Sequence, residues 1–150
     1  MAYWLMKSEP GAYSIDQLKK DRTTFWDGVR NYQARNMMRD DMRKGDQVLF
    51  YHSNCPETGV VGVATVCKEG YPDHTAFKDK KQIAKGNGDP DNPTWYMVDI
   101  RFKRKLKRVI TLAELKAERK LKNMQLVKKG NRLSVMPVTK AEFDHILSME

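Results

Sequence analysis

The alternation of apolar and polar positions predicts several strands and short helices. Apolar residues dominate 3–7 and 47–52, and β-branched residues are enriched over 60–66, so each segment is typical of a buried strand. A longer strand is predicted over 95–106, where apolar side chains at even positions alternate with charged ones. Further short strands are predicted around the apolar residues Leu126, Val127, Leu133 and Val135.

Capping residues mark the expected helix starts. Ser14 and Asn31 precede short segments with one apolar face, and the second segment predicts a helix to about Met42. Thr111–Glu114 and Thr139–Glu142 both match the capping box, in which a threonine hydroxyl and a glutamate satisfy the first helical amides.

The connections between these elements indicate the fold class. Residues 68–93 are polar and contain several glycines and prolines, which predicts a long, exposed, irregular connection. Strands and helices do not alternate as regular βαβ units. The pattern therefore favours an α+β domain with a curved or closed sheet, and the length of 150 residues predicts a single domain over 1–150.

Charge adds a class of partner to this picture. Lysine and arginine total 28 against 19 acidic residues, a net charge of +9, which favours a polyanion such as nucleic acid. No apolar run approaches the ~18 residues that cross a membrane, and the N-terminal run has no basic leader. We therefore expect a water-soluble, cytoplasmic protein without a membrane partner, and no obligate protein partner is evident.

Residues suited to catalysis or metal binding are not grouped in a recognisable way. Cys55 and Cys67 form no CxxC pair, the three histidines lack metal-site spacing, and no dinucleotide or phosphate-binding glycine motif is present. A triad of Ser53, His52 and Asp27 is disfavoured because neighbouring strand residues point to opposite faces. We expect no metal, no cofactor and no enzyme activity; a hydrolase using Asp27 or His52, or a protein-interaction module, are the alternatives.

Polar and aromatic residues cluster instead at strand ends, around 7–9, 26–31 and 51–54. A base-binding pocket needs a flat apolar wall, hydrogen-bonding groups for the base edge, and cations for phosphate. Trp26 is the predicted wall. The predicted edge contacts are Ser8, Asn31, Ser53 and Asn54. The predicted phosphate-binding rim is Lys7, Arg30, Arg35, Arg101, Lys103 and Lys105.

Structural roles account for the same residues equally simply. Trp26 also fits a position in the core, and Asn31 also fits a helix cap. Residues 53–54 also fit a turn before Pro56. The basic stretch 101–108, with six basic residues in eight, also fits a solvated strand face. Both interpretations stay open at this stage.

Taken together, the clusters resemble the EVE domain family. The resemblance begins with Tyr3–Pro10, continues through Trp26–Asn36 and Phe50–Asn54, and spans nearly the whole chain. Shorter matches follow in the same order at Gly59–Gly62, Tyr71–Asp73, Arg132–Val135 and Pro137–Thr139.

Membership in this family would imply both a fold and a function. The implied fold is a PUA-like pseudo-barrel of mixed, mostly antiparallel strands with surrounding short helices, related to YTH and ASCH domains. The implied function is that of a reader, which accommodates a modified cytosine in DNA or a modified RNA base. The residues implied to lie in pocket-lining segments are Trp26, Asn31, Ser8, Ser53 and Asn54. The basic strand is not tied to the family pattern, so its role stays a prediction from composition.

Overall fold

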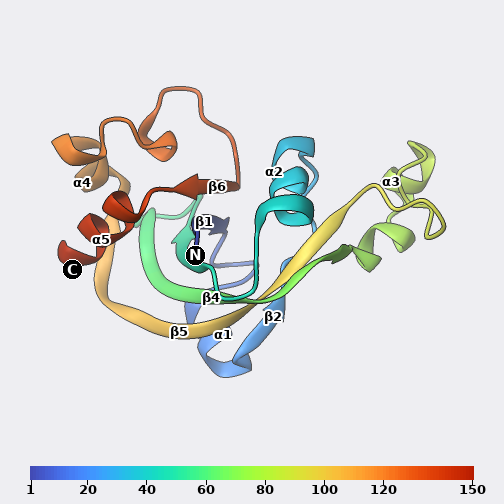
Figure 1. Ribbon diagram of the computed structural model, residues 1–150, viewed down its shortest axis with the longest axis horizontal. Helices are drawn as coiled ribbons and strands as arrows, with labels where there is room; N and C mark the ends of the chain where they lie inside the picture. The colour runs from blue at the N-terminus through green and yellow to red at the C-terminus, as the bar shows by residue number, and fades with distance from the viewer.

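A computed structural model describes all 150 residues, which are organised around one six-stranded sheet (Figure 1). The strand order is β2-β5-β4-β3-β1-β6, and only the β1–β3 pair is parallel. The strands are β1 (Tyr3–Ser8), β2 (Thr23–Phe25), β3 (Gln47–His52), β4 (Gly59–Pro72), β5 (Tyr96–Thr111) and β6 (Val135–Val138). The α+β class and the mixed, mostly antiparallel sheet are therefore confirmed, although β2 and β6 remain unpaired edges and the sheet is not closed.

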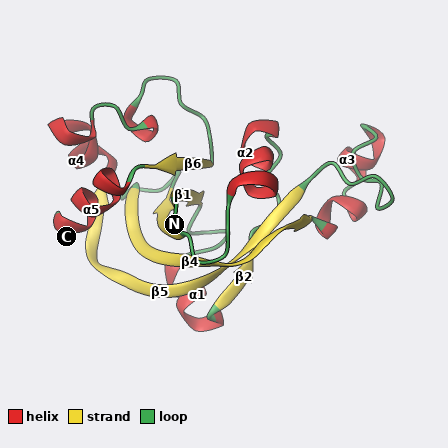
Figure 2. Cartoon of the chain, viewed as in Figure 1, coloured by secondary structure: helices red, strands yellow, loops and turns green.

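Short helices surround this sheet (Figure 2). The α-helices are α1 (Ile15–Asp21), α2 (Tyr32–Asn36), α3 (Lys80–Ala84), α4 (Leu112–Ala117) and α5 (Lys140–Ser148). A π-helical turn, Met37–Asp41, continues α2, and 3₁₀ turns occupy His74–Lys78, Arg119–Leu121 and Gln125–Val127. None of the helices has the length and apolar character needed to cross a lipid bilayer.

The predicted helix caps are confirmed. Ser14 and Asn31 accept hydrogen bonds from the backbone N–H groups of Gln17 and Ala34, respectively. Thr111 and Thr139 each form the complete capping box with the glutamate three residues later. Local hydrogen bonding, which sequence spacing reveals, therefore determines where these helices begin.

Two long strands give the sheet its curvature. β4 has 14 residues and β5 has 16, and four register shifts interrupt their pairing. Such irregularities bend strands and increase their twist. Figure 1 shows the pair sweeping from α4 and α5 at one end of the molecule to α3 at the other.

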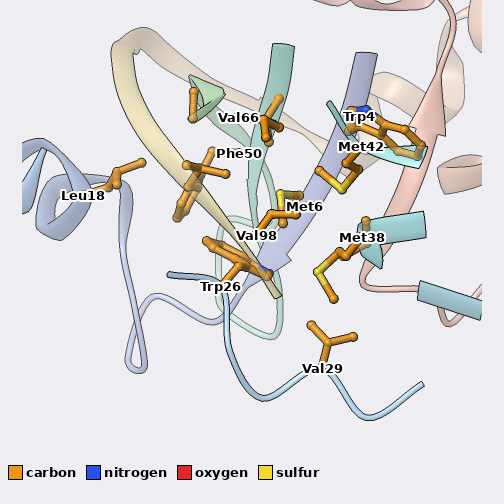
Figure 3. Close-up of a cluster of buried hydrophobic side chains, with 14 of the residues drawn as sticks. Trp4, Met6, Leu18, Trp26, Val29, Met38, Met42, Phe50, Val66 and Val98 are labelled. Carbon is orange, nitrogen blue, oxygen red and sulfur yellow. The ribbon is translucent and has the colours of Figure 1, made fainter. Parts of the chain in front are cut away.

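Both faces of the central strands are buried. Trp4 and Met6 of β1 belong to one apolar cluster with Phe50, whereas the intervening Leu5 belongs to a second cluster with Leu49. This two-sided burial explains why β1 and β3 are continuous apolar runs instead of alternating ones. The first cluster, which contains Trp26, is the one that positions the site described below (Figure 3).

Two local predictions were wrong, and one strand was not predicted. Residues 68–93 are not an irregular connection throughout, because β4 extends to Pro72 and two short helices follow. Leu126 and Val127 lie in a 3₁₀ turn and Leu133 lies outside any strand, so only the segment from Val135 forms a strand here. β2 was not predicted, since its three partly exposed residues carry no apolar alternation and are held by pairing with β5.

Candidate functional site

An open cavity of about 600 Å³ lies where β1, β2 and the segment before α1 meet. Its size falls within the range of small-molecule sites, roughly 300–1,000 Å³. The lining residues come from four separated stretches: Lys7 and Ser8; Ala12 and Tyr13; Thr24 to Arg30; and Ser134. The cavity therefore depends on tertiary packing of the strand ends.

Trp26 is both a core residue and a wall of this cavity. Its side chain is only 7% exposed, and its ring meets Phe50 edge-on with centroids 5.5 Å apart. Figure 3 shows it among Met6, Phe50 and Val98. The Trp26 indole N–H has no acceptor within the protein and is not fully enclosed, so this donor is free for a bound group. The two interpretations of Trp26 are compatible.

A buried carboxylate holds the segment after Trp26 in place. Asp73, which has no exposed surface, accepts hydrogen bonds from the Gly28 amide at 2.8 Å and the Arg30 guanidinium at 2.9 Å. Gly28 has φ +80°, a left-handed conformation that favours glycine. Asp73 also accepts from the amide and the hydroxyl of Thr75. This carboxylate therefore determines the path of one cavity wall.

The same contacts determine the ionisation of Asp73. Burial by itself would raise the pKa of this carboxyl group, but the hydrogen bonds from Thr75, Gly28 and Arg30 outweigh it and hold the pKa below its ordinary value. The ionised form is therefore the one that the loop structure stabilises.

Phe25 contributes an exposed aromatic surface to the cavity. Its side chain is 44% exposed and meets the His74 ring edge-on at a centroid distance of 5.2 Å. Large exposed aromatic residues beside a cavity are typical of binding surfaces. Sequence reasoning missed Phe25, although it directly precedes Trp26.

The end of β1 supplies two polar residues of the lining, Lys7 and Ser8. The Ser8 hydroxyl donates to the Tyr13 carbonyl at 2.7 Å, which leaves its oxygen able to accept a further hydrogen bond. Burial lowers the pKa of Lys7, whose ammonium lies 5.7 Å from the centroid of the Tyr51 ring. Arg30 completes the cationic lining.

The other predicted edge residues, Asn31, Ser53 and Asn54, do not line the cavity. They hold the segments next to it in place. Asn31 caps α2 through its side-chain oxygen. The Ser53 amide donates to the Ser8 carbonyl, and the Asn54 side chain donates to Glu9, so both tie the end of β3 to the end of β1. Of the predicted pocket residues, the structure thus brings Trp26 and Ser8 together at the cavity.

The predicted rim residues divide in the same way. Lys7 and Arg30 line the cavity, whereas Arg35 donates to the Thr94 carbonyl. Arg101 is exposed and pairs in register with Thr23 of β2, close to the cavity wall. Lys103 and Lys105 lie farther along β5, where they contact Gln47 and Asp16, respectively.

The residues of the alternative enzyme hypothesis are also separated. The His52 Nε2 atom accepts a hydrogen bond from the Ile15 amide at 3.1 Å, and burial lowers the pKa of this imidazole. Asp27 is exposed and lines the cavity, but His52 does not. His52 therefore has a structural role at the start of α1.

Comparison with known proteins gives matches along the whole chain. The sequence model of one family, described as the EVE domain, matches residues 2–149. Human thymocyte nuclear protein 1 is 46% identical over 168 aligned residues, covering 99% of this chain and 74% of that protein. That name describes a nuclear protein, so the cytoplasmic location of this chain stays a prediction.

Solved structures agree with these sequence matches. A Pseudomonas syringae protein superimposes with a TM-score of 0.93 at 44% identity, covering 99% of both chains. The human homologue, in a crystal structure of its complex with 5-methylcytosine-containing DNA, superimposes with a TM-score of 0.90 at 46% identity, covering 99% and 97% of the two chains. An ASCH protein from Zymomonas mobilis, at 12% identity and a TM-score of 0.56, shares the fold alone.

Proposed function

This chain belongs to the EVE domain family, and we propose that it binds nucleic acid by taking one modified nucleobase into the cavity beside Trp26. The observation that carries the proposal is the cavity itself: an indole wall, an exposed phenyl ring, a serine hydroxyl and two cations surround one space. The complex of the human homologue with 5-methylcytosine DNA supports modified cytosine as the base. The alternative is that the modified base belongs to RNA.

The energetics favour a base that is already unstacked. Stacking on an aromatic side chain contributes about 1–3 kcal/mol per base, whereas flipping a base from a duplex costs a few kcal/mol. These quantities nearly cancel, so affinity for duplex depends on contacts to phosphate. We therefore expect single strands, loops and mismatched sites to bind more tightly than a fully paired duplex.

Discrimination by burial of a methyl group alone is modest. Burying one methyl group contributes about 0.8 kcal/mol, which is roughly fourfold in affinity. The Ser8 oxygen and the Trp26 indole N–H are the proposed partners for the base edge. A preference well above fourfold would require a tight cage around the methyl group or, for a polar modification, a hydrogen bond to the added group.

The proposal is tested by filling the cavity. Ala12 is exposed and lines the cavity, so Ala12→Trp should occupy the space without disturbing the core. We expect this variant to lose the preference for 5-methylcytosine over cytosine in matched DNA oligonucleotides, measured by fluorescence anisotropy. Ala141→Trp, at an exposed position of α5, is the control and should retain the preference. An unchanged preference in both variants would place the base elsewhere.

Phe25 provides a second test, which leaves the core intact. Because its ring is 44% exposed, Phe25→Ala should retain the fold while weakening oligonucleotide binding by about 1–3 kcal/mol if a base stacks on it. Ile83→Ala, at a residue that is 53% exposed on α3, is the control. Equal affinities for the two variants would exclude stacking on Phe25. The same titrations with RNA oligonucleotides distinguish the two polymers.

A further inference from the structure

A second hollow of about 480 Å³ adjoins the base cavity through a shared residue, Lys7. Its other walls come from Tyr51 of β3, from α4 and from residues 126–131, the segment that leads toward β6. Figure 1 shows this segment as an orange loop that arches beside α4 before it returns to β6. The two hollows therefore meet at Lys7, near the C-terminal end of β1.

The lining of the second hollow is cationic and contains no acidic residue. Four lysines line it: Lys7, Lys116, Lys128 and Lys129. None of them is engaged in an ion pair, since the lysines that form such pairs in this protein are Lys105 and Lys140. Unpaired cations around a concave surface attract phosphate groups.

Backbone donors add to this lining at the tip of the segment. The amides of Lys129 and Gly130 donate to no acceptor in the protein, and Gly130 has φ +81°. Adjacent free amides at a turn with one left-handed residue are suited to an anion. Leu112, Leu126 and Val127 form the apolar part of the hollow, which suits the hydrocarbon surface of a sugar.

The basic strand β5 differs in that three of its six cations are neutralised by ion pairs. Lys105 pairs with Asp16 at 2.8 Å, Arg104 with Glu150 at 2.6 Å, and Arg108 with Glu114 at 2.9 Å. Each of these pairs would have to be broken or shared before the cation could neutralise a phosphate. The lysines of the second hollow carry no such penalty.

We propose that the second hollow binds the sugar–phosphate backbone that continues from the base held in the cavity, with Lys128 and Lys129 neutralising phosphates and Lys7 lying between base and backbone. This inference rests on the proposed function and assigns the path of the strand. Binding of the base and binding of the backbone are then separable properties of two hollows that meet at Lys7.

The test measures the salt dependence of binding to a single-stranded DNA oligonucleotide containing 5-methylcytosine. In the double variant Lys128→Ala, Lys129→Ala, the slope of log affinity against log salt should fall by about 1.4, at roughly 0.7 per phosphate neutralised in a single strand. Affinity for the nucleoside 5-methyl-2′-deoxycytidine, which has no phosphate, should not change. The double variant Lys80→Ala, Lys81→Ala on α3 removes the same charge elsewhere and should leave the slope nearly unchanged.

Two results would overturn the inference. One is an unchanged slope in the Lys128, Lys129 variant. The other is a larger fall in a Lys103→Ala, Lys105→Ala variant, which would place the phosphates on β5. The proposed function is judged separately, by whether the unsubstituted protein prefers the methylated oligonucleotide. If the unsubstituted protein shows no preference for the methylated oligonucleotide, both proposals fail. If it shows the preference but the salt slope of the Lys128, Lys129 variant is unchanged, only the proposed backbone site fails.

Discussion

Replacing Asp73 with alanine is expected to lower the free energy of unfolding by about 3 kcal/mol and to abolish selective base binding. Removing one partner of a buried ion pair typically costs 3–5 kcal/mol. The lower end applies because the Arg30 side chain is 22% exposed and can recover some solvation. The Gly28 amide would also lose its acceptor, so the segment carrying Trp26 should become mobile.

Urea unfolding and oligonucleotide binding check this prediction together. Asp91→Ala is the matched control, because Asp91 is exposed and its carboxylate holds no neighbouring segment. Unfolding free energies of the Asp73 and Asp91 variants within about 0.5 kcal/mol of each other would contradict the anchoring role, since ordinary surface substitutions have effects of that size.

The Asp73 contribution should also depend on pH in a defined direction. The folded-state pKa of this carboxyl group is depressed, so its stabilisation is fully present above the unfolded pKa of about 3.9 and is lost as the pH falls through the folded value. The stability difference between the unsubstituted protein and Asp73→Ala should therefore be constant near neutrality and shrink in strong acid. A difference that grows below pH 4 would contradict this assignment.

Replacing Trp26 with alanine is the second substitution with a large expected effect. Truncating a buried aromatic residue costs about 3–5 kcal/mol of stability, and here it would also remove the cavity wall. Trp4→Ala is the matched control, since Trp4 belongs to the same apolar cluster but does not line the cavity. Both variants should be destabilised, but only the Trp26 variant should lose its preference for the modified base.

A more conservative substitution distinguishes loss of the binding site from loss of the folded structure. Trp26→Leu keeps an apolar side chain in the core while it removes the indole ring and its free N–H. We expect thermal unfolding to show a smaller loss of stability than for Trp26→Ala, with base binding still weakened by about 1–3 kcal/mol. A folded Trp26→Leu protein with unchanged affinity would show that the indole is not part of the site.

Local features of the fold were predictable because their causes are local. Capping at Ser14, Asn31, Thr111 and Thr139 involves residues within one helical turn, and the apolar runs of β1 and β3 report burial on both faces. β2 could not be predicted in this way, because three partly exposed residues become a strand only by pairing with β5. Pairing partners far apart in the chain leave no local signal.

The candidate site, too, could be predicted from the sequence only in part. Trp26 and Ser8 were predicted from their position at strand ends, and both line the cavity. Asn31 has a side-chain amide suited to a base edge, but α2 uses the oxygen of that amide for capping. In the sequence, Asp73 stands out only as part of the Tyr71–Asp73 match to the family. Its role depends on a hydrogen bond from the Gly28 amide, 45 residues away. Residue type indicated which groups suit a base, but tertiary packing decides which of them are free.

The central claim, that a base enters the cavity beside Trp26, is tested most directly by the three indole N–H signals in a ¹⁵N-correlated NMR spectrum. Trp4 and Trp95 are internal controls, because their indole N–H groups donate to Asp46 and Gln82 within the protein. Titration with a 5-methylcytosine oligonucleotide should shift the Trp26 indole and the Gly28 amide while the Trp4 and Trp95 indoles stay in place. A Trp26 indole signal that does not move at saturation would contradict the account.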